Sequence, residues 1–145
     1  MSPLEASQGN EGQFDPGQGT ERGGPLTFCL LKIASMHGLS VSVDRLLSGL
    51  PLENDWLVPS CVDRAAARAG MTSRVVRAPL QRLNTALAPL ILVLEGNGAC
   101  VLLSADLKGG TAQVLFPELD QGEATVPLKE LEARYSGYAF YVKPV

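Results

Sequence analysis

The spacing of apolar residues changes at Gly70, and this change constrains the fold more than any other feature of the sequence. Before Gly70, apolar residues recur every three or four positions, as they do along one face of a helix. After Gly70, short apolar runs alternate with glycine and proline, which is typical of strands joined by turns. Helices followed by mainly antiparallel strands indicate an α+β domain, and 145 residues with 46% hydrophobic content can bury one core.

Three helices are predicted before Gly70. Residues 25–37 form the first, because Pro25 suits an opening helical turn, where its missing N–H costs nothing. Ser42 caps a short second helix, and Ser60 caps the third, which Gly70 ends. The apolar stripe of the first helix is predicted to contain Leu26, Cys29, Leu30, Ile33 and His37.

The second half of the chain is predicted to form a sheet. Gly96, Asn97 and Gly98 are residues that favour a hairpin turn, so the runs on either side of them should pair. A short helical turn is expected after Pro79, and a helix over residues 127–135 before the last strand. Strands are predicted at residues 73–78, 90–95, 99–104, 112–116, 124–126 and 138–143.

The first 24 residues are predicted to be a disordered leader, and residues 25–145 the folded domain. Glycine, glutamine, glutamate, serine and proline dominate this segment. Four acidic residues and one arginine give it the whole formal net charge of −3, so the folded body is neutral. A neutral body argues against binding a nucleic-acid backbone. No apolar run is long enough to cross a bilayer, and no secretory signal is recognised, so a cytoplasmic location is expected.

The cysteines are predicted to be buried free thiols. Cys29, Cys61 and Cys100 are odd in number, and their spacing fits no zinc pattern. Cys29 lies eight residues before His37, the single histidine, which is roughly 12 Å along a helix axis and too far for a catalytic dyad. A pairing of His37 in space with Cys61 or Cys100 stays open. No nucleotide, phosphate or metal motif is present, so no cofactor and no metal are predicted.

Several segments, in order, resemble a known family. The chain is similar to the N-terminal cysteine-peptidase-like domain of bacterial type I secretion ABC transporters, the family that includes the double-glycine leader peptidases. Such a domain has a papain-like fold, with N-terminal helices packed on a mainly antiparallel sheet. The matching segments are PLTFCL (25–30), MHG (36–38), AAARAG (65–70), PLILVL (89–94), GACVLL (98–103) and RYSGYA (134–139).

The resemblance implies that the catalytic positions of the family are vacant in this chain. Pro25 stands where the active peptidases have their nucleophilic cysteine. Ala99 stands at the position of the histidine, and Phe116 at that of the acid. The oxyanion glutamine would align with Gly19, and a tryptophan that stacks on the histidine in some inactive relatives would align with Val93. Transporters that export RTX toxins and adhesins have such a non-catalytic domain.

The expected function is therefore docking of an unfolded secreted protein before export. The domain would lie on the cytoplasmic side of the bacterial inner membrane, in cis to the permease and ATPase and tethered through a downstream transmembrane domain. No nucleic acid is expected as a partner, and this segment itself is not expected to insert into the membrane. The emptied groove should be apolar, with Leu26, Val93, Ala99, Cys100 and Tyr138 as substrate-binding residues.

Two alternatives stay open at this point. The chain could be an active papain-like cysteine peptidase that uses Cys29 or Cys100 to trim a leader from the exported polypeptide. It could also be a passive domain that serves only transporter assembly. Trp56 lies in a polar loop, where exposure for recognition and packing in the core are equally compatible with the sequence.

Overall fold

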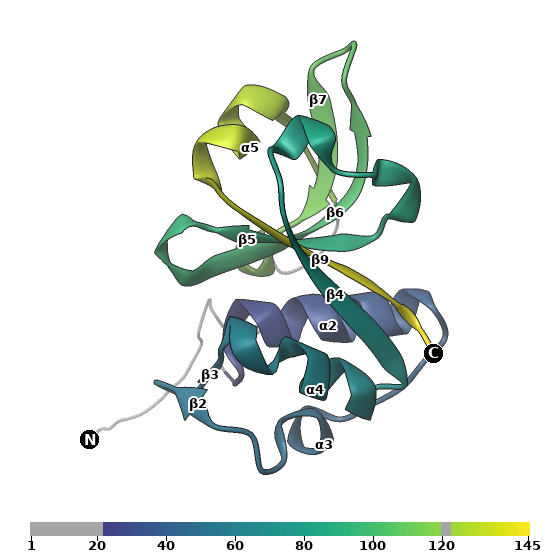
Figure 1. The fold of residues 1–145 in the computed structure, drawn as a ribbon, viewed down its shortest axis with the longest axis vertical. Coiled ribbons are helices and arrows are strands. Elements are labelled where there is room, and N and C mark those ends of the chain that lie inside the picture. The colour runs from purple at the N-terminus through teal and green to yellow at the C-terminus, as the bar shows by residue number, and fades with distance from the viewer. Residues whose placement is uncertain (1–21, 120–122) are drawn as a thin grey trace, which may run out of the picture.

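A computed structural model describes residues 22–119 and 123–145 of the chain. Its helices α2, α3 and α4 lie on one side of a twisted sheet, and helix α5 lies on the other (Figure 1). This arrangement confirms the predicted α+β class with a mainly antiparallel sheet. The predicted leader falls mostly on residues 1–21, which are outside the described part. Gly23 and Gly24, which the predicted leader includes, are part of the folded structure.

The helical layer follows the predicted apolar stripes. Helix α2 (Gly24–Met36) buries Cys29, Leu30 and Ile33 against the sheet, and α3 (Val43–Leu47) begins at Ser42, whose side chain accepts a hydrogen bond from the Arg45 N–H. Helix α4 (Val62–Arg68) completes the layer and ends before Gly70.

Two details of the predicted helices are wrong. His37 is exposed and caps α2 with non-helical backbone angles, which take its side chain off the buried stripe. Ser60 does not cap α4. It lies inside a 3-10 turn, η3 (Pro59–Cys61), that Pro59 begins and that leads directly into the helix.

The sheet has six antiparallel strands in the order β4-β9-β5-β6-β7-β8. Its last strand in sequence lies between two earlier ones, and short 3-10 turns η4 (Leu80–Arg82), η5 (Thr85–Leu87), η6 (Glu95–Asn97) and η7 (Pro117–Leu119) connect the strands. Helix α5 (Leu128–Arg134) precedes that last strand. The strands are β4 (Met71–Arg77), β5 (Leu90–Leu94), β6 (Gly98–Asp106), β7 (Thr111–Leu115), β8 (Ala124–Pro127) and β9 (Tyr135–Pro144).

Two hydrophobic cores lie on the two faces of the sheet, and strand alternation divides the central hairpin between them. On β6, Ala99 and Val101 belong to the core under α2, whereas Cys100 and Leu102 belong to the core that includes Leu131 of α5. Successive strand residues point to opposite faces, so each core takes every second side chain.

A small hairpin, which the sequence analysis did not predict, holds the start of α2. Strands β2 (Leu52–Glu53) and β3 (Trp56–Leu57) pair around Asn54 and Asp55, which both have positive φ. Gly23 joins the hairpin as a third segment: its N–H donates to the Asp55 carbonyl over 2.9 Å, and its carbonyl accepts from the Leu57 N–H over 2.7 Å. The Trp56 ring covers Gly24, and a Cβ there would lie 2.5 Å from the ring Cγ.

Substituting Gly24 tests this contact, with Gly96 as the matched control. Both glycines have φ of +74°, but a Cβ on Gly96 would meet nothing within 4 Å. We expect Gly96→Ala to lower the free energy of unfolding by about 1 kcal/mol, the cost of the left-handed backbone. Gly24→Ala should cost about 2 kcal/mol more, because the Trp56 ring must move. Urea unfolding measures both, and equal losses would contradict the contact.

Candidate functional site

A cleft of about 500 Å³ opens where the first turn of α2, the β2–β3 hairpin and the β5–β6 hairpin meet. Its apolar lining includes Leu26 from α2, Trp56 from β3, Val93 from β5 and Tyr138 from β9. Trp56 and Tyr138 are 37% and 44% exposed, so both aromatic rings are accessible to a ligand. The polar residues at the cleft come from the two hairpin turns and include Glu53, Asn54, Glu95 and Asn97.

A second cavity, of about 370 Å³, continues the cleft across the sheet. The two cavities share Pro59, Val93 and Tyr138, so we describe them together as the groove. The second cavity adds Val75 from β4 and Phe140 from β9, and no charged side chain lines it. The groove therefore runs from the hairpin turns to strand β4 over a mainly apolar floor.

The structure places the five predicted binding residues in three different environments. Leu26, Val93 and Tyr138 line the groove, and their role in binding stays a prediction. Ala99 pairs with Val93 in the β5–β6 ladder but is 2% exposed and lies in the core beneath the groove. Cys100 is on the opposite face of the sheet, so its prediction as a groove residue is wrong. Adjacent residues of one strand cannot both face the same cleft.

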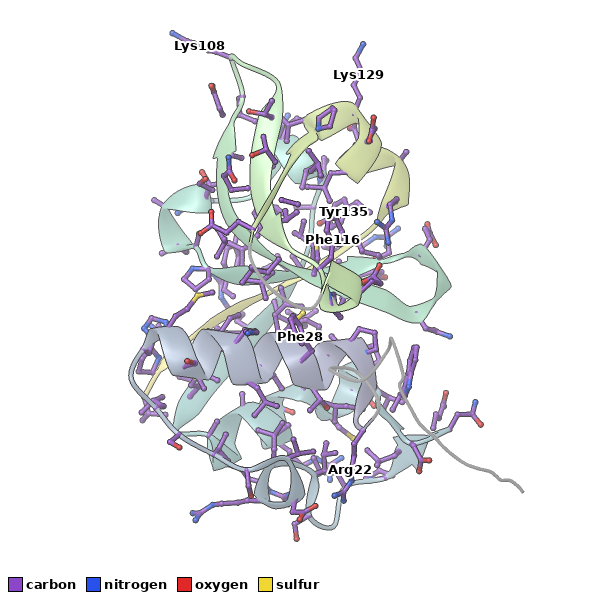
Figure 2. All side chains as sticks on the ribbon, turned by 180° about the vertical axis from the view of Figure 1, so that it is seen from behind. Arg22, Phe28, Lys108, Phe116, Lys129 and Tyr135 are labelled. Carbon is purple, nitrogen blue, oxygen red and sulfur yellow. The ribbon has the colours of Figure 1, made fainter. Side chains whose placement is uncertain are left out.

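The three positions that were predicted to be vacant carry side chains without catalytic chemistry. Pro25 is half-buried in the first turn of α2, and Ala99 is buried in the helix-facing core. Phe116 follows β7, and the Arg134 guanidinium lies 5.0 Å from the centre of its ring. Figure 2 shows Phe116 and Tyr135 on the sheet side of α2, which carries Phe28. A pyrrolidine, a methyl group and a phenyl ring supply no nucleophile and no proton-transfer group.

Two of the buried thiols, Cys29 and Cys100, lie in surroundings that oppose ionisation. Burial raises the pKa of Cys29 well above its ordinary value, and Cys100 and Glu118 raise it further. Burial also raises the pKa of Cys100, to about 12, although Arg134 acts in the opposite direction. Cys61 is buried as well, and its Sγ accepts a hydrogen bond from Nη2 of Arg64 over 3.5 Å. The predicted burial of all three free thiols is confirmed.

The one histidine does not extend this chemistry to the groove. His37 is exposed at the C-terminal end of α2, whereas the groove lies at the helix's N-terminal end. Across residues 22–119 and 123–145, no group of three or more potential metal-binding side chains comes together. None of the helices in that part of the chain has the length and apolar character needed to cross a membrane.

Trp56 and the polar residues of the hairpin turns are the site residues that sequence reasoning missed. The sequence left two alternatives for Trp56, an exposed side chain and a side chain packed in the core, and the structure shows a partly exposed ring that also packs on the backbone. One part of the ring covers Gly24 while the residue lines the cleft. The segment from 52 to 57 contains only two pairs of strand residues around two polar ones, which is too short for periodicity to reveal.

Alkylation kinetics test the state of the thiols. With pKa values this high, Cys29 and Cys100 hold almost no thiolate at pH 7. In the native domain, we expect the reaction of iodoacetamide with Cys100 to be at least about a hundredfold slower than its reaction with the free thiol of glutathione. All three thiols should react quickly in guanidinium chloride, which is the control. Mass spectrometry of tryptic peptides locates the label, and rapid modification of Cys29 or Cys100 at pH 7 would contradict their buried, neutral state.

The same thiols make stability depend on pH. A thiol whose pKa is raised by folding stabilises the fold below its unfolded pKa, near 8.5, and that stability falls as the pH rises. For Cys100 the loss should reach about 2 kcal/mol at pH 10. Urea unfolding at pH 7 and pH 10 measures it. Cys100→Ala should show a smaller decrease than the unmodified chain, and equal decreases would exclude Cys100 as a cause.

Comparisons with known proteins place this geometry in a family. The family model described as the peptidase C39 family matches residues 24–145. The N-terminal peptidase C39 like domain of the toxin secretion ATP-binding protein from Vibrio parahaemolyticus is 36% identical over 83% of this chain and 97% of that one, with a TM-score of 0.81. A search of curated proteins finds no match.

Two more distant structures have the same fold. A double glycine motif protease from an AMS/PCAT transporter, solved in complex with the leader peptide, is 20% identical over 83% of this chain and 84% of that one, with a TM-score of 0.68. The peptidase domain of Streptococcus ComA, a bi-functional ABC transporter, is 14% identical over 83% of this chain and 91% of that one, with a TM-score of 0.70. The family match and the similarity to the Vibrio domain agree with the helices, the sheet and the groove: this chain belongs to the peptidase C39 family.

Proposed function

We propose that this chain is a non-catalytic domain of a type I secretion ABC transporter and that it docks the unfolded export substrate in its groove. One observation carries the proposal. The groove lies at the N-terminal end of α2 and is mainly apolar, and the residues that the resemblance aligns with the family's catalytic positions, Pro25, Ala99 and Phe116, have no reactive group. An apolar groove without catalytic groups is suited to hold a polypeptide rather than to cut it.

The transporter setting is inferred from the similar structures. The Vibrio domain is the N-terminal part of a toxin secretion ATP-binding protein. ComA is an ABC transporter. By this similarity, the domain would lie in the cytoplasm, next to a membrane-spanning and ATP-hydrolysing partner in cis. We further propose a large RTX-type toxin or adhesin as its cargo, because transporters with this kind of vacant site export such proteins.

The groove has the surface that an unfolded polypeptide requires. Two exposed aromatic side chains, Trp56 and Tyr138, combine apolar contact area with few rotatable bonds, which reduces the entropy lost on binding. In the part of the groove next to β4, the other lining residues are mainly apolar. Ordering a disordered ligand offsets part of this contact energy, so we expect affinity in roughly the micromolar range or weaker. Weak binding suits a site that must release its cargo to the transporter.

Retained peptidase activity is the second candidate, and the state of the thiols opposes it. A cysteine nucleophile needs a lowered pKa and a base within hydrogen-bond reach. The pKa values of Cys29 and Cys100 are raised instead, and His37 lies at the far end of α2. Incubating the domain with unfolded cargo and analysing the products by mass spectrometry tests this candidate directly. Specific cleavage that Cys29→Ser or Cys100→Ser abolishes would overturn the non-catalytic proposal.

Trp56 supplies a direct test of docking, because it is the only tryptophan and lines the groove. We expect its fluorescence to change with an RTX-repeat polypeptide kept unfolded in chelator, and not with the same polypeptide folded by calcium. Tyr138→Ala should weaken binding about tenfold, the effect of removing an exposed aromatic anchor.

Leu107→Ala is the matched control for this titration. Leu107 is also an exposed apolar residue, 58% accessible, but it lies in the β6–β7 connection and does not line the groove. Binding should be unaffected by that change. An unfolded polypeptide that leaves Trp56 fluorescence unchanged, or equal weakening by both substitutions, would contradict docking in the groove. A transporter that fails to assemble without the domain would support the assembly role instead.

A further inference from the structure

Strand β4 has a free edge at one end of the sheet. The sheet order places β4 and β8 at the two edges (Figure 1). Strand β8 has four residues and ends in Pro127, which blunts it as a pairing partner. Strand β4 has seven residues and no proline, and Val75 at its centre is 56% exposed. It is therefore the longer and more accessible edge in the described part of the chain.

The alternation of hydrogen bonds along β4 shows which of its backbone groups point away from β9. The Val145 N–H donates to the Gly70 carbonyl, and the Ala78 N–H donates to the Gly137 carbonyl, each over 3.0 Å. In an antiparallel pair, hydrogen-bonded and non-hydrogen-bonded positions alternate. Even-numbered residues of β4 therefore bond to β9, and the odd-numbered ones direct N–H and C=O to the free edge. These outward-facing residues of β4 are Met71, Ser73, Val75 and Arg77.

The side chains along this edge lead to different cavities on the two faces of the sheet. Val75 lines the apolar part of the groove, together with Phe140 and Tyr138. On the other face, a cavity of about 280 Å³ is lined by Arg74 and Lys143. Its remaining lining residues are Thr72, Leu87, Tyr141 and Val142, so this cavity, which we call the basic pocket, contains no acidic residue.

The cations of the basic pocket are available for an external anion. The Arg74 guanidinium lies 5.2 Å from the centre of the Tyr141 ring, which orients it without neutralising its charge. The ion pairs found in residues 22–119 and 123–145 are Arg22 with Asp44 and Arg134 with Glu118. Neither Arg74 nor Lys143 takes part in them.

We propose that the export substrate adds to β4 as an extended antiparallel or parallel strand, with apolar side chains toward the groove and acidic side chains toward the basic pocket. This inference rests on the proposed docking function and specifies its ligand. An added strand pairs through its backbone, while pockets on the two faces select alternate side chains. The two cavities at β4 differ in charge, so they select a segment in which apolar and acidic residues alternate.

A second copy of this chain fits the same edge less well. Pairing two β4 strands side by side would bring both copies of Arg74 and both copies of Arg77 to one seam. Like charges on adjacent strands destabilise the pairing. An acidic substrate strand removes that repulsion, so charge complementarity favours the substrate as the occupant.

The probe is a capped nine-residue peptide of alternating valine and glutamate, added to the isotope-labelled chain. We expect amide exchange at Ser73, Val75 and Arg77 to slow in the complex. The amides of Thr72, Arg74 and Val76 already bond to β9 and should change little. Two N-methylated versions of the peptide separate backbone pairing from side-chain contact. Methylating the three pairing amides should weaken binding about a hundredfold, and methylating the intervening amides should have little effect.

Variants of the chain complete the test. Val75→Pro removes one outward N–H without breaking the β4–β9 ladder, so it should weaken binding while the thermal midpoint stays near that of the unmodified chain. Arg74→Glu should weaken binding about fivefold to tenfold. Arg45→Glu is the matched control, since Arg45 is exposed on α3 and lines neither cavity. A peptide of alternating valine and lysine should not bind.

The outcomes separate this inference from the proposed function. Slowed exchange at Ser73, Val75 and Arg77, together with sensitivity to the pairing N-methyl groups, supports strand addition. Binding without slowed exchange, equal affinity of both methylated peptides, or dimerisation through β4 would overturn it. If the peptide fails to bind while unfolded RTX polypeptide still changes Trp56 fluorescence, strand addition is wrong and docking stands. If neither ligand binds, both proposals are wrong.

Discussion

The insertion of β9 between β4 and β5 is the constraint on which the rest of the structure depends. This strand comes last in the sequence, yet it pairs with β4 over residues 138–144 and with β5 at residues 135 and 139–141. It thereby connects β4, which directly follows the helical layer in the sequence, to the central β5–β6 hairpin. It also places Tyr138 and Phe140 in the groove and leaves β4 with one free edge. Without β9, the segments on either side of the groove would have no common framework.

The proposed absence of catalysis and the burial of the thiols have the same physical basis. In an active cysteine peptidase, the site must stabilise a thiolate, which requires a cation, a helix end or hydrogen bonds near the sulfur. Here Pro25 and Ala99, which the resemblance aligns with two catalytic positions, supply only apolar atoms, and Cys29 lies in the core, where burial favours the neutral thiol. A surface of this kind loses little by desolvation when an apolar ligand covers it, because few polar groups have to be stripped of water.

Sequence reasoning predicted the elements whose periodicity extends over several turns or strand pairs. The stripe of α2 and the hairpin around residues 96–98 have this property, and both were found, with His37 as the one predicted stripe residue that lies off the buried face. The short hairpin that holds Gly23 was missed because positive φ at Asn54 and Asp55 leaves little trace in the sequence. The error at Cys100 was different. Ala99 and Cys100 were assigned to one groove although strand geometry alone places them on opposite faces.

The groove could be predicted only in part, because it is a product of contacts between distant segments. Its lining comes from α2, β3, β5, β9 and β4, and no local pattern shows that these meet. Its charge distribution follows from the same packing. Acidic Glu53 and Glu95 lie at the hairpin end of the groove, whereas basic Arg74 lies beyond its β4 end, in the basic pocket on the opposite face of the sheet. An extended polypeptide along this path meets repulsion for its acidic residues near the hairpins and attraction near β4. The fold therefore favours a polypeptide whose acidic segment lies at β4 over one whose acidic segment lies at the hairpins, although most of the contact surface is apolar.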